Sequence, residues 1–124
     1  MRPLLDVRLD GGPDAPSEAR SALRRLEVEL GGLSEDVALL VSELVTNAVV
    51  HAKADAIQLS VLPRPPDNVR VEVTAPGPLW EPPIKPRPGP LGGFGFFFVD
   101  RLAQDWGVVS KERESQVWFE ISPQ

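Results

Sequence analysis

Three polar residues spaced by four, Glu43, Asn47 and His51, are the residues of this 124-residue chain best suited to chemistry. In a helix, this spacing places the three side chains in one row. A carboxylate such as that of Glu43 can deprotonate a hydroxyl group or a water molecule, and the side-chain oxygen of Asn47 is a ligand that Mg²⁺ accepts. The same row also fits ordinary polar residues at the margin of an amphipathic helix, and spacing alone favours that interpretation. We interpret His51 as structural, because the dipole at a helix C-terminus favours a charged histidine.

The helix that carries this row is expected to run from an N-cap at Ser34 to about Ala52. Its first turn is acidic, which the helix dipole favours. Apolar residues recur at helical spacing and mark one buried stripe, formed by Val37, Val41, Leu44 and Ala48. Counted at about 100° per residue, the polar row lies beside this stripe and not opposite to it. We therefore expect the row at the margin of a cleft.

A glycine run, Gly92, Gly93 and Gly95, precedes a second candidate helix that extends to about Gln104. Free amides at the start of a helix bind anions, and glycine lets a phosphate approach the backbone. Glycine pairs also end loops for purely steric reasons, so the run alone is a weak signal. Before it lies a proline-rich segment, residues 75–91, which excludes a helix or a central strand. This segment is either a functional lid or a plain surface loop.

The remaining pattern predicts strands and one more helix. Alternation of apolar and polar residues predicts a short strand over residues 5–9, a hairpin of residues 57–61 and 69–73, and a closing pair at residues 108–109 and 117–121. The connection of the first hairpin, residues 63–68, is rich in proline and is expected outside the ladder. A helix is expected from a cap near Ser17 to Gly31 and Gly32. The predicted fold class is α+β, a two-layer sandwich with helices on one face of a mostly antiparallel sheet.

Composition excludes several classes of protein. The formal net charge of −5 argues against direct nucleic-acid binding, which needs a basic surface. The chain has no cysteine, which excludes disulfides and thiolate metal sites, and a single histidine, which excludes a multi-histidine metal site. No apolar run approaches the roughly 20 residues of a membrane helix, and the N-terminus has no secretory signal. We expect a cytoplasmic protein that does not interact with a membrane.

Together these motifs resemble a known superfamily. Residues 43–52 resemble the asparagine-containing box of the GHKL (histidine-kinase-like) ATPases, and residues 91–96 followed by 99–103 resemble their second glycine box. Trp106-Gly107 and residues 117–121 are similar to the branch of bacterial anti-sigma-factor serine/threonine kinases. The resemblance extends over about residues 33–121 in family order. It implies a Bergerat-type α/β sandwich, formed as a single domain by residues 1–124, that holds ATP and Mg²⁺ between the helices and the sheet.

The resemblance also assigns roles to residues. Asn47 would bind Mg²⁺, Glu43 would be the catalytic base, and residues 75–91 would be the ATP lid. The nucleotide-binding positions implied by the motifs are Asn47, Ala75, Gly77, Gly92, Gly93, Phe94 and Gly95. Kinases of this branch phosphorylate a serine on an anti-anti-sigma partner with a STAS fold, and they commonly form homodimers that sequester a sigma factor. The implied function is an ATP-binding anti-sigma-type regulator with serine/threonine kinase activity.

Two positions depart from the family pattern. Ala75 stands where relatives carry an aspartate that accepts a hydrogen bond from the adenine amino group, and Phe94 stands where many relatives have a basic residue. Losing a hydrogen bond to a charged group costs about 1.5–3 kcal/mol, or about ten- to 150-fold in affinity. The alternative function is therefore a non-catalytic interaction module of the same fold with weak or no nucleotide binding.

Overall fold

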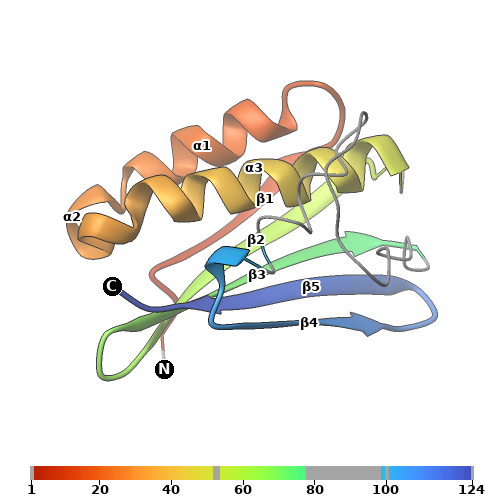
Figure 1. The fold of residues 1–124 in the computed structure, drawn as a ribbon. Coiled ribbons are helices and arrows are strands. Elements are labelled where there is room, and N and C mark those ends of the chain that lie inside the picture. Colours follow the sequence, from red (N-terminus) through yellow and green to blue (C-terminus); the bar gives the residue numbers. More distant parts are fainter. Residues whose placement is uncertain (1, 52–53, 78–98, 100, 124) are drawn as a thin grey trace.

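The computed structural model describes residues 2–51, 54–77, 99 and 101–123. Figure 1 shows two layers, with the helices packed over one face of a sheet. The helical elements are α1 (Ala15–Arg24), α2 (Glu27–Leu30), the 3₁₀ helix η1 (Gly31–Leu33) and α3 (Ser34–His51). The strands are β1 (Leu5–Asp10), β2 (Ala56–Arg64), β3 (Asn68–Pro76), β4 (Asp105–Ser110) and β5 (Glu114–Ile121). The predicted α+β fold class, with helices on one face of the sheet, is confirmed.

The five strands are antiparallel to their neighbours and follow the order β1-β2-β3-β5-β4. Because side chains alternate between the two faces of a strand, every second residue points toward the helices. One such row crosses the whole sheet and consists of Val7, Leu59, Val73, Val117 and Val108. β-branched and apolar residues at these positions build the sheet half of the core.

Small residues let α1 pack closely on α3. Ala15 and Ala19 are fully buried, and Ala22 is 8% exposed. With Leu23 they form one apolar stripe at helical spacing. Arg20 Nη1 donates a hydrogen bond to Ser42 Oγ of α3 at 3.3 Å, which marks the flank of α3 that faces α1. The stripe of α3 that the sequence predicted is buried completely, with Val37, Val41, Leu44 and Ala48 all at 0% exposure.

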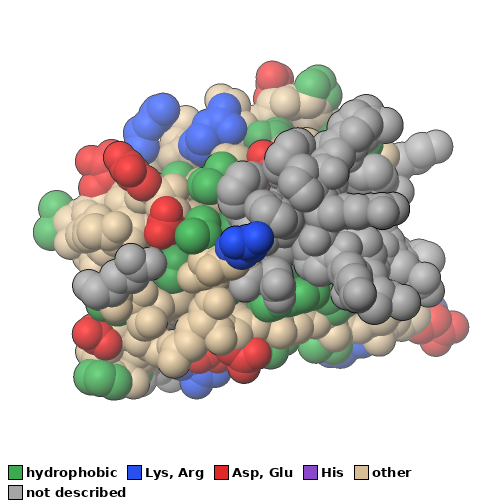
Figure 2. All heavy atoms as spheres, in the orientation of Figure 1, with side chains coloured by type: hydrophobic (Ala, Val, Ile, Leu, Met, Phe, Trp, Pro, Cys, Tyr) green, Lys and Arg blue, Asp and Glu red, His purple; other side chains and the backbone are tan. Residues whose placement is uncertain are grey.

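The face of the sheet away from the helices is covered by paired polar side chains. Arg70 binds Glu72 at 2.9 Å and Glu120 at 3.1 Å, and its guanidinium lies 4.2 Å from the centre of the Trp118 ring. Gln116 Nε2 donates to Thr74 Oγ1 at 3.1 Å. Cross-strand pairs of this kind stabilise a solvent-facing sheet. Figure 2 shows basic and acidic side chains interspersed over the helix layer, on the described part of the face that it presents.

The N-terminal helix differs from its prediction. It begins at Ala15, with Asp14 as N-cap, and not near Ser17. Pro16 lies in the first turn, where a proline costs no intrahelical hydrogen bond. The helix is also interrupted after Arg24, and the short α2 then ends at Leu30 before Gly31, whose φ is +52°. Periodicity alone could not place this interruption, because the buried residues Leu26 and Leu30 continue the same apolar spacing.

Three further predicted boundaries of helices and strands were wrong. Ser34 is the first residue of α3 and not a cap outside it. Pro63 pairs with Val69 inside the β2–β3 ladder, so the hairpin connection is shorter than predicted. Pro63 is tolerated because it lies beyond the end of β1, which pairs with β2 as far as Val61. At the other end, β3 includes Ala75 and Pro76, which pair with Ser115 and Glu114, so the first two residues of the segment predicted as a loop are strand.

The described helices include none that is long and apolar enough to cross a membrane. The predicted helix that follows the glycine run is described at its end, where Val99, Arg101 and Leu102 are helical. Ala103 N donates to Val99 O at 2.9 Å, which closes the last turn. This helix therefore ends slightly earlier than Gln104.

Replacing Gly11 with Ala is expected to destabilise the fold by about 3 kcal/mol. A Cβ at this position would lie 2.0 Å from the carbonyl oxygen of Ala54, and a shift of the backbone away from it would strain the hydrogen bond that Gly11 N donates to Asp55 O at 2.9 Å. Urea unfolding followed by circular dichroism measures the change. Gly32→Ala is the matched control, since a Cβ there meets no atom within 4 Å. Equal stabilities of the two variants would contradict the steric explanation.

Candidate functional site

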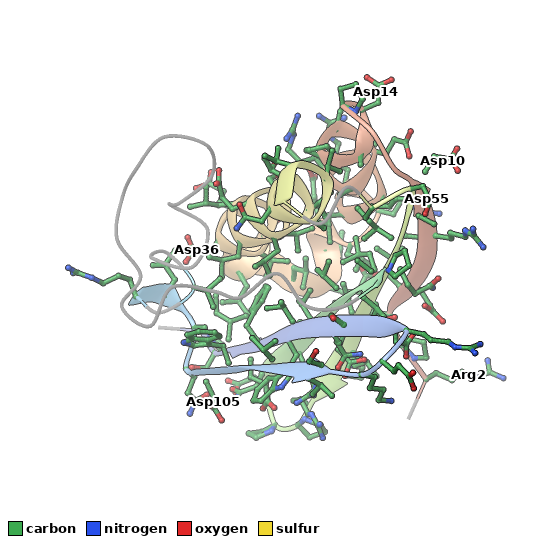
Figure 3. The ribbon with its side chains drawn as sticks, turned by 90° about the vertical axis from the view of Figure 1, so that its right-hand side faces the viewer. Arg2, Asp10, Asp14, Asp36, Asp55 and Asp105 are labelled. Atoms are coloured by element: carbon green, nitrogen blue, oxygen red, sulfur yellow. The ribbon has the colours of Figure 1, made fainter. Side chains whose placement is uncertain are left out.

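Glu43 and Asn47 lie on the flank of α3 that is turned away from α1. Ser42 faces α1 through its bond with Arg20, and each following residue turns the helix by about 100°. Figures 1 and 3 both place the helical turn around Val99 on the other side of α3 from α1. Val99 is fully buried and Leu102 packs against the core. Glu43 and Asn47, the row predicted from spacing, therefore lie on the same side of α3 as the helical turn around Val99.

Asn47 is the most unusual side chain of the described core. It is 2% exposed, and its Oδ1 atom has no hydrogen-bond partner among the described residues. A buried polar atom without a partner costs about 1–3 kcal/mol, so such atoms are rare unless they have a function. The atom is an uncharged oxygen that can coordinate a cation. The fully buried apolar stripe of α3 holds the helix that carries it in a fixed position. This position suits a ligand to a hard cation.

Glu43 is half-buried one turn before Asn47. Partial removal from water raises the pKa of the Glu43 carboxyl above its ordinary value of 4.5. A carboxylate with a raised pKa holds a proton more strongly, which makes it a better proton acceptor at neutral pH. The interpretation of Glu43 and Asn47 as ordinary boundary residues accounts less well for a buried amide whose oxygen has no partner among the described residues.

Replacing Glu43 with Gln is expected to stabilise the protein at pH 7. The pKa of Glu43 is higher in the folded protein than in the unfolded chain, so the folded state binds more protons and stability falls as the pH rises above 4.5. The glutamine variant lacks this penalty, and its advantage should shrink as the pH is lowered toward 4.5. Urea midpoints of both proteins at several pH values measure the difference.

Glu35→Gln in the exposed first turn of the same helix is the matched control for that measurement. A carboxylate there interacts favourably with the helix dipole, so its loss should lower stability slightly at pH 7. A Glu43→Gln variant that is less stable than the native protein at pH 7 would contradict the role of burial.

The end of β3 forms the second part of the candidate site. Ala75 is 2% exposed, points toward the helix layer and pairs with Ser115 of β5. Ser115 is also 2% exposed, and its Oγ donates to Gly77 O at 3.0 Å. Gly77 N in turn donates to Arg113 O at 2.8 Å, and the φ of Gly77 is +92°. Figure 1 shows that β3 ends under the C-terminal end of α3, so Ala75 and Asn47 belong to the same end of the sandwich.

Sequence reasoning missed Ser115. A signal for it exists in the sequence, because Ser115 is the polar exception in the helix-facing series of β5 that continues with Val117, Phe119 and Ile121. A small hydroxyl group on the otherwise apolar, helix-facing side of a strand is a candidate ligand contact. The structure adds that Ser115 lies directly opposite Ala75.

Four predicted nucleotide-binding residues, Gly92, Gly93, Phe94 and Gly95, lie outside the described residues. The same holds for residues 78–91 of the candidate lid and for the side chain of His51. Of the predicted residues that the structure describes, Asn47, Ala75 and Gly77 lie toward the same end of the sandwich, and Glu43 lies one helical turn before Asn47. The juxtaposition of this group with the glycine run stays a prediction.

Comparison with known proteins decides the family. A family model described as the histidine kinase-like ATPase domain matches residues 12–121. The chain belongs to the histidine kinase-like ATPase domain family. No curated protein matches it at a significant level.

Solved structures share the fold of this histidine kinase-like ATPase domain. The RsbU and RsbW domains of Rv1364c from Mycobacterium tuberculosis match with a TM-score of 0.72 at 21% identity, covering 98% of this chain and 32% of that chain. The SiaB–SiaC complex from Pseudomonas aeruginosa matches with a TM-score of 0.70 at 14% identity, covering 98% of this chain and 91% of that chain. The histidine kinase domain of the blue-light activated histidine kinase from Erythrobacter litoralis EL346 matches with a TM-score of 0.59 at 24% identity, covering 87% of this chain and 59% of that chain.

This chain thus spans about a third of the Mycobacterium chain and less than two thirds of the Erythrobacter chain. All three identities are below 25%, so the matches establish the fold. The two matches that cover 98% of this chain include its N-terminal elements as well as its motif-bearing part.

The described residues of this ATPase domain fit Mg²⁺ better than they fit adenine. Asn47 Oδ1 offers one oxygen that has no partner among the described residues, and those residues contain no cluster of three acidic or histidine side chains that could enclose a metal alone. A metal held by Asn47 would therefore take its other ligands from phosphates and water, which is usual for Mg²⁺. At the end of β3, the side chain of Ala75 supplies no hydrogen-bond acceptor for a base, and Ser115 is the polar residue opposite to it.

Proposed function

We propose that this chain is an ATP-dependent serine/threonine protein kinase of the anti-sigma-factor type. The observation that carries the proposal is the buried Oδ1 of Asn47, which has no hydrogen-bond partner among the described residues and lies one helical turn from a carboxyl group whose pKa is raised. An amide buried without a partner is costly for the fold, and a nucleotide-associated cation would satisfy it. The motif resemblance and membership of the ATPase-domain family support ATP as the nucleotide.

In this proposal, three residues of the chain have defined tasks. Asn47 holds the cation through Oδ1, and bound Mg²⁺ would neutralise charge on the phosphates. Glu43 accepts the proton of the attacking serine hydroxyl, the serine oxygen forms a bond to the γ-phosphorus of ATP, and the bond to the β-phosphate oxygen breaks to release ADP. Gly77 donates its amide to Arg113 O, just before β5, and accepts at its carbonyl from Ser115 of β5, which fixes the point at which the chain leaves β3.

The proposed protein substrate is a serine of a STAS-type anti-anti-sigma partner, with a sigma factor as the alternative protein ligand. Support comes from the motif similarity to the anti-sigma-factor kinases and from the fold shared with an RsbW domain and with SiaB. The SiaB–SiaC structure is a complex of two proteins, which supports a partner-binding role for a domain of this shape.

Calorimetric titration of the native protein with ATP in the presence of Mg²⁺ tests the nucleotide part of the proposal. We expect saturable binding that is lost when EDTA removes the metal. Incubation with radiolabelled ATP and a STAS-domain protein then tests transfer, and Glu43→Gln should retain binding while losing transfer by about 10²–10⁴-fold. No binding heat at millimolar nucleotide would rule out a working kinase.

Ala75 favours a second candidate, a protein-interaction module that kept the fold and lost most of its nucleotide affinity. The position is 2% exposed and its side chain offers no acceptor to a base. This candidate predicts that partner binding is the same with and without ATP. Phosphate transfer by the native protein to a partner would exclude it.

A further inference from the structure

Strand β1 has a free edge. It is the outermost strand of the sheet next to β2, and no other strand of the described chain pairs with it. Gly11 N donates to Asp55 O, and the hydrogen bonds of an antiparallel pair repeat at every second residue. The backbone groups of Asp6, Arg8 and Asp10 therefore face away from β2. They are placed to form main-chain hydrogen bonds with one further strand.

A groove of about 630 Å³ lies beside this edge, between β1 and α1. Val7 and Leu9 line the groove from β1, and the small residues Ser17, Ser21 and Ala22 line it from α1. Small side chains on the helix leave room for side chains of an added strand that point toward the helix layer. Extended peptides bind in this way elsewhere, because a strand edge supplies main-chain hydrogen bonds and a neighbouring groove takes every second side chain.

Charges of alternating sign lie along the edge, on the face of the sheet away from the helices. The side chains of Asp6, Arg8 and Asp10 are all exposed. Ser60 Oγ donates to Asp6 Oδ1 at 2.8 Å, which orients this carboxylate, and Arg8 forms no ion pair with a described residue. Figure 3 shows Asp10 and Asp14 close to the point where β1 leads into α1, so this end of the edge is acidic. The edge thus presents the charge order negative, positive, negative.

We propose that this edge and groove bind an extended segment of another protein with the pattern basic, apolar, acidic, apolar, basic. In an antiparallel alignment, the basic residues of the segment lie opposite Asp10 and Asp6, and its acidic residue lies opposite Arg8. Its two apolar residues lie beside Leu9 and Val7 and point into the groove. The inference goes beyond the proposed function and does not depend on nucleotide binding, because no candidate nucleotide-binding residue lies on β1 or α1.

The charge order favours a complementary segment over a second copy of the same strand. Like charges that lie directly opposite each other destabilise a strand pair. If β1 pairs antiparallel with its own copy so that all three charges have partners, Arg8 faces Arg8 and Asp6 faces Asp10. A segment of the proposed pattern forms three pairs of opposite charge instead. The charges therefore protect the edge from indiscriminate pairing and at the same time define one kind of partner.

Fluorescence anisotropy with the full chain tests the proposal. The probe is a fluorescein-labelled peptide that contains Lys-Val-Glu-Val-Lys, and its matched control has every charge inverted, Glu-Val-Lys-Val-Glu. We expect saturable binding of the probe in the micromolar range, and binding of the control that is weaker by at least about tenfold. Equal binding of the two peptides would overturn the proposal. So would the absence of probe binding at millimolar protein, and sedimentation velocity would then tell whether a second copy occupies the edge.

Replacing Arg8 with Glu tests the register. This variant should bind the probe at least about tenfold more weakly, and it should bind a peptide with Lys-Val-Lys-Val-Lys more tightly than the native protein does. Arg24→Glu is the matched control, since Arg24 belongs to α1 and does not line the groove. Circular dichroism checks that both variants are folded. An Arg8→Glu variant that binds the probe as the native protein does would overturn the proposed site.

Methylation of single backbone amides in the probe separates strand pairing from simple attraction between charges. In the proposed alignment, the amide of the central glutamate faces the backbone of Arg8, and the valine amides point away from β1. Methylation of the glutamate amide should therefore abolish binding, whereas methylation of one valine amide should preserve most of it. Equal effects of the two methylations would contradict pairing with the edge of β1.

Discussion

Replacing Asn47 with Ala is expected to weaken Mg²⁺-dependent ATP binding by at least about 100-fold, because it removes the oxygen ligand that α3 contributes. The same change should raise the free energy of unfolding by about 1–2 kcal/mol, since a buried oxygen without a described partner disappears. Opposite effects on binding and stability are characteristic of a functional group that strains the fold. Calorimetric titration and urea unfolding measure the two quantities.

Thr46→Ala is the matched control for this experiment. Thr46 is the neighbouring polar residue of the same helix, and its Oγ1 donates a hydrogen bond to the backbone oxygen of Ser42 at 2.7 Å. Its loss should leave nucleotide affinity unchanged. If Asn47→Ala binds Mg²⁺ and ATP as the native protein does, or loses stability, then Asn47 is a core residue whose partner lies elsewhere, and the proposed metal site is wrong.

Replacing Ala75 with Asp is expected to raise ATP affinity by about ten- to 150-fold. The new carboxylate would extend from the end of β3 toward the helix layer, opposite the hydroxyl of Ser115. In the family pattern an aspartate here accepts a hydrogen bond from the adenine amino group. Because position 75 is 2% exposed, the buried charge should lower stability without nucleotide by roughly 1–3 kcal/mol. Calorimetry with ATP, and unfolding with and without ATP, measure these effects.

Ala75→Asn separates the effect of charge from that of shape. Its side chain has nearly the same size and a neutral acceptor, so its gain in affinity should be clearly smaller. GTP is a second comparison, because guanine lacks the amino group at the corresponding position and should gain nothing from the Ala75→Asp change. Equal gains for ATP and GTP would show that position 75 does not contact the base.

Much of the fold could be predicted from the sequence, because two periodicities are strong. Spacing by three and four residues identified the buried stripe of α3, and alternation identified the strands. The wrong predictions concern element boundaries, where a local sequence rule conflicts with the tertiary structure. Pro63 and Pro76 were expected to exclude strand, but a proline is compatible with a ladder wherever its missing N–H has no partner to lose. The interruption after Arg24 was invisible because apolar spacing continues across it.

The candidate site was predictable in part. Helical spacing placed Glu43 and Asn47 in one row, and the offset of that row from the buried stripe indicated a margin of the core. The sequence could not show that Asn47 Oδ1 lacks a partner among the described residues, because this depends on what surrounds it in three dimensions. The sequence also could not show that Ala75 pairs with Ser115. β3 and β5 are far apart in the sequence, so no local pattern determines their register.

Trp106 and Trp118 lie on opposite faces of the sheet, since Trp106 pairs with Phe119 on the helix side and Trp118 pairs with Gly107 on the outer side. Two of the three tryptophans of the protein are therefore natural fluorophores in separate environments. The indole of Trp106 shares its face with the nucleotide-binding candidates, while the indole of Trp118 lies beside the Arg70 guanidinium. Emission spectra of single-tryptophan variants would distinguish events inside the sandwich from events on its exterior, with no attached dye.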